Sequence, residues 1–213
     1  MPLIRAVLFD YGLVLSGPPA PHAWRRMQSV LNTDDPAFHD AYWRHRYSYD
    51  LGQLDGDHYW QAVRRDLRRD LSADDLAALI DADIDLWTQP NQPMIDWAAA
   101  LQAEGTLTGI LSNMGDAMED GIAARLPWMA NFPKQIYSHR LGIAKPDERI
   151  YGHAISTLGV APGEILFVDD RIENVEAARA LGLNAVQYSS HNDFLREFHA
   201  DGLTGLPQPV TSQ

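Results

Sequence analysis

The sequence predicts an α/β fold in which a parallel sheet with helices on both faces carries an inserted all-helical domain. Two observations indicate the sheet: short apolar runs alternate with helical stretches, and several runs end on an acidic or hydroxyl side chain. A third observation indicates the insert, because residues 17–90 contain amphipathic helical patterns and no strand pattern. A chain of 213 residues is long enough for one core and a small accessory domain.

The first element is an apolar run from Arg5 to Phe9 that stops abruptly at Asp10. A central parallel strand is buried on both faces, so it appears as a continuous apolar run and carries the next side chain to its carboxyl end. Asp10 interrupts the apolar start and the turn-forming segment 17–19 follows it, which argues against a signal peptide. We therefore expect a buried strand here.

The insert is predicted to hold four amphipathic helices, at His22–Leu31, Pro36–Tyr49, Asp57–Asp70 and Ser72–Trp87. It carries most of the tryptophans of the chain, which are Trp24, Trp43, Trp60 and Trp87. Large aromatic side chains at helical spacing most often belong to the core of a helix bundle. We expect these four to be core residues.

The rest of the chain alternates between the two kinds of element. The expected strands are Leu107–Leu111, Gln135–Tyr137, Ile165–Val168 and Ala185–Tyr188. The expected helices are Asn91–Glu104, Asp116–Leu126, Asp147–Leu158 and Ile172–Leu181. Gly105, Gly159 and Gly182 stand where helices commonly end on a glycine. Only the tail after Leu206 is expected to be disordered.

Composition excludes several classes of function. The formal net charge of −12 leaves no broad basic surface for nucleic acid or anionic lipid. The chain has no cysteine, which excludes disulfides, thiolate nucleophiles and cysteine metal ligands. No apolar run approaches the roughly 20 residues that a membrane-spanning helix needs. We expect a cytoplasmic protein whose chemistry depends on oxygen and nitrogen groups.

Polar side chains gather at the carboxyl ends of the expected strands, where open parallel sheets bind ligands. Asp10 follows the first strand, Ser112 the second and Asp169–Asp170 the fourth, while Lys145 precedes the helix before that fourth strand. Alone, each of these residues could be a turn, a helix cap or a solvated charge. Together, three converging carboxylates require a cation, and oxygen ligands suit magnesium. Lys145 and Ser112 could then hold a phosphate while Asp10 attacks it.

These segments resemble the four motifs of the haloacid dehalogenase-like (HAD) hydrolases. The resemblance rests on residues 8–14 (LFDYGLV), 110–113 (ILSN), 145–147 (KPD) and 167–170 (FVDD) with Asn174. It extends over nearly the whole chain, because the insert is similar to the small α-helical cap of that superfamily.

The resemblance implies a role for each matched residue. Asp10 would form an aspartyl-phosphate and bind Mg²⁺, with the Gly12 backbone carbonyl as a second ligand. Asp170 would bind the metal directly, and Asp169 and Asn174 would support it through waters or hydrogen bonds. The phosphoryl oxygens would be held by Ser112, Lys145 and the Asn113 amide.

One position departs from the pattern of the family. Phosphatases of this superfamily usually have a second aspartate two residues after the nucleophile, as the acid that protonates the leaving alcohol; here Gly12 stands there. A general acid contributes about 100-fold to 10,000-fold. Glycine here resembles a subgroup with sugar-1-phosphate phosphatases and the phosphatase domain of soluble epoxide hydrolases. A water or a cap residue could supply the proton, although His45, Arg46 and Tyr47 more often mark a solvated helix face.

Three other functions compete with a phosphatase. Metal-free dehalogenases of this fold resemble the chain at Lys145 and Tyr151, but they typically lack the Asp169–Asp170 pair. Receiver domains of bacterial signalling use similar groups in another order, with the acidic pair on the first strand. A non-catalytic relative that binds a phosphorylated ligand or a partner is the third alternative.

We therefore predict a Rossmann-like core from residues 1–16 and 91–213 and a helical cap domain from residues 17–90. The predicted function is a Mg²⁺-dependent phosphatase that hydrolyses a small phosphorylated metabolite. Candidate substrates are sugar phosphates, other small phosphomonoesters and phosphoanhydrides. No nucleic acid or membrane partner is expected.

Overall fold

A computed structural model describes residues 3–200 and 206–209 of the chain. The sheet has five parallel strands in the order β3-β2-β1-β4-β5, with β1 at its centre. The strands are β1 (Ala6–Phe9), β2 (Leu107–Ser112), β3 (Lys134–Tyr137), β4 (Ile165–Asp169) and β5 (Asn184–Gln187). Chain order reverses at β1, whose neighbours β2 and β4 lie on opposite sides, so the crevice between their carboxyl ends is a topological switch point.

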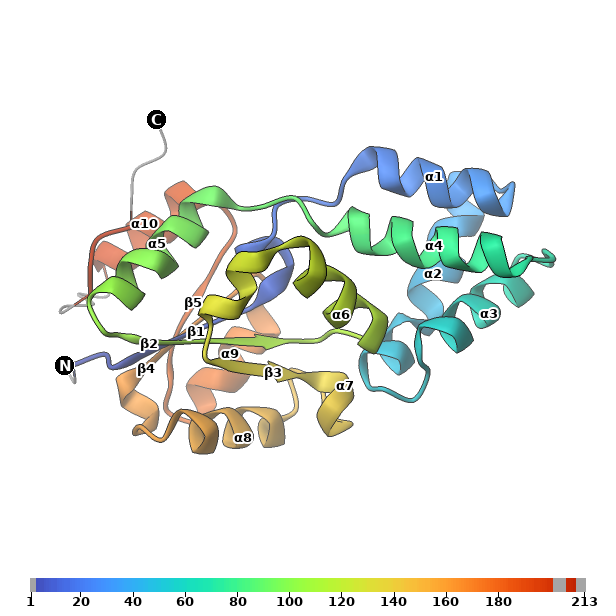
Figure 1. Cartoon of the computed structure of the whole chain (residues 1–213). Coiled ribbons are helices and arrows are strands. Elements are labelled where there is room, and N and C mark those ends of the chain that lie inside the picture. The colour runs from blue at the N-terminus through green and yellow to red at the C-terminus, as the bar shows by residue number, and fades with distance from the viewer. Residues whose placement is uncertain (1–2, 201–205, 210–213) are drawn as a thin grey trace.

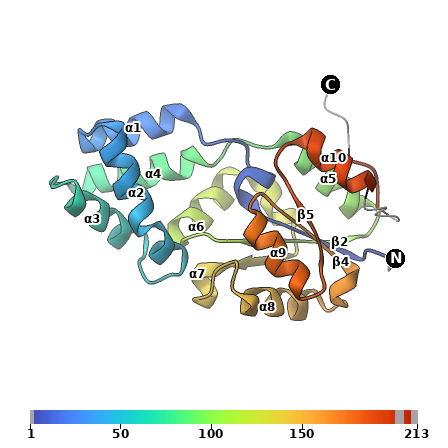
Figure 2. The ribbon, with the colours of Figure 1, turned by 180° about the vertical axis from the view of Figure 1, so that it is seen from behind.

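Helices cover both faces of this sheet (Figures 1 and 2). One face packs against α5 (Gln92–Ala103), α6 (Asp116–Arg125) and α10 (His191–Ala200). The other packs against α8 (Glu148–Leu158) and α9 (Ile172–Ala180). Shorter helical segments are η1 (Tyr11–Leu15), η2 (Pro127–Asn131), α7 (Ser138–Leu141) and η3 (Pro162–Glu164).

The central strand shows why the sheet needs two helical layers. All four residues of β1 are fully buried, and their side chains alternate between two apolar clusters. Val7 and Phe9 belong to the cluster under α5 and α10, whereas Ala6 and Leu8 belong to the cluster under α8 and α9. The continuous apolar run that predicted a buried strand therefore serves both faces.

Four helices form a separate group beyond one end of the sheet, and we call this segment, residues 17–90, the helical insert (Figure 1). They are α1 (Pro21–Leu31), α2 (Asp35–Asp50), α3 (Gly56–Asp66) and α4 (Ala73–Leu86). Two connecting segments, which we call the chain crossings, join the insert to the sheet near Ser16 and Pro90. They lie side by side, because Ser16 pairs with Pro90 in an antiparallel bridge. The Gly17 amide also donates to the Gln89 carbonyl at 2.6 Å.

Two glycines of the sheet region allow the helical insert to pack closely. A Cβ at Gly115 would lie 2.2 Å from the ring of Tyr49, and one at Gly121 would lie 2.2 Å from the Cδ1 of Ile84. Both distances are far below van der Waals contact, so a larger residue would force the insert and α6 apart. The insert therefore packs directly against α6, the helix that follows β2.

The predicted fold class is confirmed: a parallel α/β sheet with helices on both faces and an all-helical segment after β1. The five strands and eight predicted helices are all present. The helix predicted at Asp57–Asp70 ends earlier, at Asp66, and Arg68 beyond it adopts a left-handed φ of 53°. The boundaries between core and cap stay a prediction.

One helix was missed by the sequence analysis, and two of its expectations need correction. Helix α10 was not predicted, and its Phe194 and Phe198 pack on Trp97 far away in the sequence. The expected disorder after Leu206 is wrong for Pro207, whose carbonyl accepts a hydrogen bond from the Trp97 indole at 2.8 Å; residues 210–213 lie outside the described residues. Trp43 is 45% exposed, although Trp60 is buried as expected.

In the part of the chain that the structure describes, no helix combines the length and the apolar character needed to span a membrane.

Candidate functional site

Three carboxylates and one ammonium group meet at the carboxyl edge of the sheet, beside the switch point. Asp10 follows β1, Asp169 ends β4 and Asp170 comes next. One oxygen from each of these three carboxylates lies within 4.8 Å of the others. The parallel pairing of β1 with β4 produces this convergence, since it continues past Phe9 in a bond from the Asp10 amide to the Val168 carbonyl.

Lys145 lies between two of these carboxylates. Its Nζ is 2.8 Å from Asp10 Oδ1 and 2.6 Å from Asp169 Oδ2, and both lysine and acids are almost completely buried. Burial alone would lower the pKa of Lys145, but Asp10 and Asp169 raise it above its ordinary value. The lysine is therefore charged, and it compensates part of the negative charge of the site.

The Asp10 carboxylate is held in one orientation. Its Oδ1 accepts hydrogen bonds from the Tyr11 amide at 2.6 Å and from Lys145. Burial raises the Asp10 pKa from 3.8 to about 7, a shift that Lys145 opposes and that Asp169 and Asp170 reinforce. A buried cluster of three acids with a single lysine favours binding of a further cation, because a divalent ion would remove this penalty.

Asp169 and Asp170 have different surroundings. Both oxygens of Asp169 are occupied, since Oδ1 accepts from the Asn174 side chain at 2.8 Å and from the Arg171 amide at 2.9 Å, and Oδ2 accepts from Lys145. Asp170 is only partly buried, and no other described side chain hydrogen-bonds its carboxylate. Burial and then Asp169 raise the pKa of Asp170 to about 6. Asp170 is thus the acid best suited to bind a metal directly, with Asp169 in support.

Asn113 places Lys145 through an interaction that sequence reasoning missed. The Asn113 side chain donates to the Lys145 carbonyl at 3.0 Å and accepts from the Lys145 amide at 2.9 Å. This two-way contact fixes the lysine backbone to the end of β2. Ser112, the last residue of β2, is buried and lies in the same cavity as Asp10 and Lys145.

These groups form the floor of a cavity of about 470 Å³, which we call the chamber. All eight sequence-predicted site positions except Asp169 line it: Asp10, Gly12, Ser112, Asn113, Lys145, Asp170 and Asn174. The helical insert adds Trp43, Arg46, Tyr47, Asp50 and Trp87. The four positions on α2 are spaced i, i+3, i+4 and i+7, which places them on one helix face. This periodicity is the signal that could have identified them.

The expectation that Arg46 lies on a solvated helix face is wrong. Arg46 is 9% exposed, and its Nη1 bonds both oxygens of Asp83 at 3.3 Å while its Nε bonds Asp50 at 3.2 Å. Asp83 stands 37 residues later in the chain, on α4, so the pairing has no local sequence signal. Burial raises the pKa of Asp50, against the lowering effect of Arg46.

Of the other two suggested proton donors, His45 and Tyr47, only Tyr47 faces the chamber. His45 does not line the chamber, and its Nε2 lies 2.9 Å from Asp66 on the outside of the helical insert. Tyr47 lines the chamber and is 63% exposed.

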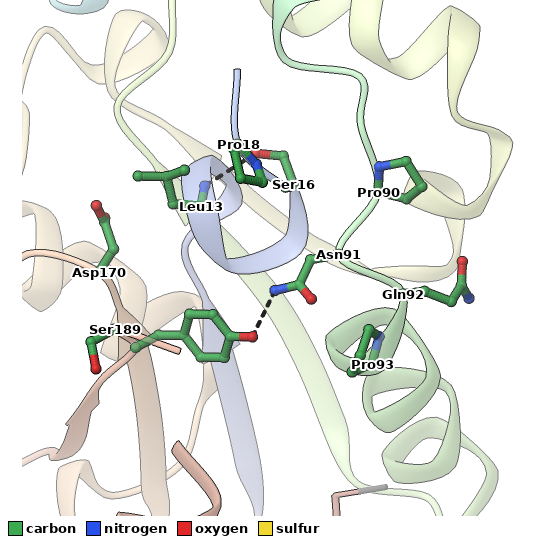
Figure 3. A pocket seen from close by; sticks show the side chains of 11 residues that line it. Leu13, Ser16, Pro18, Pro90, Asn91, Gln92, Pro93, Asp170 and Ser189 are labelled. Atoms are coloured by element: carbon green, nitrogen blue, oxygen red, sulfur yellow. Dashed lines mark hydrogen bonds between the residues drawn. The ribbon is translucent and has the colours of Figure 1, made fainter. Parts of the chain in front are cut away.

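A second cavity of about 600 Å³ lies on the other side of η1, beside the two chain crossings (Figure 3). Asp170 and Leu13 stand on one side of it and Pro90, Gln92 and Pro93 on the other. Leu13 and Asp170 line both cavities. Of the three acids, Asp170 alone therefore borders both cavities.

The chain is similar to a known family of hydrolases and to several of its characterised members. The family model of the haloacid dehalogenase-like hydrolases matches residues 4–182. Bifunctional epoxide hydrolase 2 of Rattus norvegicus is 31% identical over 122 residues, which are 55% of this chain and 22% of the rat protein. (S)-2-haloacid dehalogenase 1 of Pseudomonas sp. is 32% identical over 136 residues, which are 61% of this chain and 59% of that protein.

A solved structure supports the same fold. A HAD family enzyme from Bacteroides thetaiotaomicron, in complex with magnesium and inorganic phosphate, has a TM-score of 0.71 at 18% identity. The likeness covers 92% of this chain and 99% of the Bacteroides chain. The chain spans less than two thirds of the two curated relatives named above. Since the family model matches most of the chain, this protein belongs to the haloacid dehalogenase-like hydrolases.

Proposed function

We propose that the chain is a Mg²⁺-dependent phosphatase that hydrolyses a small phosphomonoester through an aspartyl-phosphate on Asp10. The observation that carries this proposal is the acidic triad of Asp10, Asp169 and Asp170, with Lys145 between two of its members. The magnesium and phosphate bound by the Bacteroides relative support it.

The donor set fits magnesium. Hard divalent ions prefer carboxylate and carbonyl oxygens, and the acidic triad offers carboxylate oxygens that lie close together. Asp10, Asp170 and the backbone carbonyl of Gly12, which all line the chamber, would hold the ion. Asp169 would not bind the ion directly but would support the site through its hydrogen bonds with Lys145 and Asn174. When bound, the ion supplies positive charge that draws the phosphate to the site and stabilises its transferred oxygens.

The residues of the chain then divide the reaction between them. An Asp10 oxygen attacks phosphorus, the P–O bond to the alcohol breaks, and the alcohol oxygen takes a proton from solvent in the chamber. Lys145, the Ser112 hydroxyl and the Asn113 backbone amide hold the phosphoryl oxygens. Water then hydrolyses the aspartyl-phosphate and restores the Asp10 carboxylate.

A 2-haloacid dehalogenase is the competing function, since the Pseudomonas relative carries that name. Phosphate release from p-nitrophenyl phosphate and chloride release from a 2-chloro acid should be measured on the same protein, each with magnesium and with EDTA. We expect phosphate release that EDTA abolishes and no chloride release. Chloride release that is insensitive to EDTA would instead make the chain a dehalogenase.

The glycine at position 12 allows a test of the missing acid. A Cβ at Gly12 would meet no atom within 4 Å, and its φ of −62° suits any residue, so an aspartate fits there. We expect Gly12→Asp to speed hydrolysis of an alkyl phosphate about tenfold or more, because a general acid stabilises a poor leaving group. Hydrolysis of p-nitrophenyl phosphate, whose leaving group needs no proton, should change little. If Gly12→Asp changed the rates for both esters equally, the new aspartate would not act by protonating the leaving group.

A further inference from the structure

Exposed apolar side chains are concentrated at the chamber. Among the described residues, the large hydrophobic side chains that are exposed are Leu3, Leu13, Trp43, Tyr47 and Ile172. Leu13, Trp43 and Tyr47 all line the chamber. Scattered exposed apolar residues are ordinary on a protein surface, but a group that borders one cavity indicates a contact surface.

The aromatic pair comes from a single helix face. Trp43 and Tyr47 are one turn apart on α2, with 45% and 63% of their surfaces exposed. Leu13 reaches the chamber from η1, on the sheet side. Met118 and Ile122, which lie four residues apart on α6, and Met114, just before that helix, add apolar lining to the chamber. The space above the acidic floor is therefore bordered by apolar surface from both the insert and the core.

The cations that line the chamber are already paired. Lys145 contacts Asp10 and Asp169, Arg46 contacts Asp50 and Asp83, and Arg171 contacts Glu173. The helical insert thus adds no unpaired positive charge to the chamber. A second anionic group on the substrate, such as a carboxylate, would lose its hydration there without a partner.

We infer that the chamber selects phosphomonoesters whose alcohol part is uncharged and apolar, and that Trp43 and Tyr47 form the surface against which this alcohol lies. This inference rests on the proposed phosphatase function and specifies its substrate class. A volume of about 470 Å³ is within the range of pockets that enclose small organic ligands, so it has room for an alcohol of several carbons beside the phosphate. Sugar phosphates fit less well, because their hydroxyl groups need many polar partners and these walls are mostly apolar.

A series of esters of primary alcohols tests the inference, because leaving groups of one kind keep the chemical step comparable. Ethyl, octyl and 2-(2-naphthyl)ethyl phosphate should be compared with glucose 6-phosphate and phosphoglycolate, with magnesium present and below micelle-forming concentrations. We expect kcat/KM for the octyl and naphthylethyl esters to exceed that for ethyl phosphate about 100-fold, since each buried CH₂ adds to binding. Glucose 6-phosphate and phosphoglycolate should not exceed ethyl phosphate.

Substitutions of Trp43 and Tyr47 test whether these two residues cause the preference for apolar esters. Trp43→Ala and Tyr47→Ala should each lower kcat/KM for the octyl and naphthylethyl esters about tenfold, mainly through KM. The loss should be much smaller for ethyl phosphate and for competitive inhibition by inorganic phosphate, because these ligands have little or no apolar group to lie against the aromatic surface. His45→Ala is the matched control, since His45 lies on the same helix and faces Asp66 outside the chamber.

The outcomes separate the two proposals. If neither p-nitrophenyl phosphate nor any of the five esters is hydrolysed with magnesium, the phosphatase function itself is wrong. If p-nitrophenyl phosphate is hydrolysed but none of the five esters is, the substrate class is wrong. If ethyl phosphate is hydrolysed but the apolar esters gain nothing, or if glucose 6-phosphate or phosphoglycolate is preferred, the substrate class is wrong while the function stands. If the preference exists but Trp43→Ala and Tyr47→Ala leave it intact, these residues do not form the binding surface.

Discussion

Asp10→Asn is expected to lower kcat for p-nitrophenyl phosphate by at least about 10⁴-fold, equivalent to about 5 kcal/mol of barrier. The amide cannot form a stable phosphoryl ester, so the covalent route closes. The side chain keeps its shape, and its oxygen can still accept from the Tyr11 amide and from Lys145. The loss should therefore appear in catalysis and not in folding, as measured by steady-state rates beside a thermal unfolding curve.

Asp40→Asn provides the matched control for this change. Asp40 lies on α2, and its side chain is 77% exposed, with only a long contact of 3.9 Å to His39. Its substitution should leave the rate within about twofold of the unmodified protein, as for most surface changes. An Asp10→Asn protein that kept a tenth or more of the original rate would exclude Asp10 as the nucleophile.

Lys145→Met is expected to impair both activity and folding. The variant loses the group that would hold a phosphoryl oxygen, which should lower kcat about 10³-fold. It also leaves Asp10 and Asp169 buried without their cation. Removing one partner of a buried ion pair typically costs about 3 kcal/mol of unfolding free energy. Urea unfolding in EDTA measures this cost without compensation from a metal.

The stability loss in Lys145→Met should depend on pH. Asp10 has a pKa raised from 3.8 to about 7, so the folded state binds its proton more tightly, and the stability from this group falls as pH rises from about 4 to about 7. Without Lys145, which lowers the Asp10 pKa, the folded pKa rises further. The variant should be much less stable than the unmodified protein at pH 8 and closer to it at pH 5, where Asp10 is protonated.

Lys134→Met is the control, because Lys134 is the other lysine of the chain and lies on β3, outside the chamber. It should show neither the activity loss nor the pH dependence. A Lys145→Met protein with equal stability losses at pH 5 and pH 8 would show that the carboxylate cluster does not cause the loss.

The sequence predicts most of the floor of the site because its signals are local. A buried strand reveals itself as an apolar run, and the parallel sheet then brings the residues after each strand to one edge. Asp10, Ser112 and Asp169 could be placed together for this reason. Lys145 was also predicted, although the reciprocal bonds from Asn113 that fix it depend on the folded loop.

The walls of the chamber were harder to predict because they depend on packing between distant segments. Arg46 is buried only because Asp83 on α4 lies against α2. Trp43 was expected in the core, but it lies on the face of α2 that lines the chamber. Helix α10 was missed because its apolar partners, such as Trp97, come from a helix almost 100 residues earlier.

The most direct test of the account is to locate the phosphoryl group during turnover. The protein should be quenched in acid while hydrolysing p-nitrophenyl phosphate with magnesium, then digested at low pH and sequenced by mass spectrometry. We predict a base-labile phosphoryl group on Asp10 that is absent from Asp10→Asn. A phosphoryl group on another residue, or rapid turnover with Asp10 unmodified at every quench time, would contradict the account.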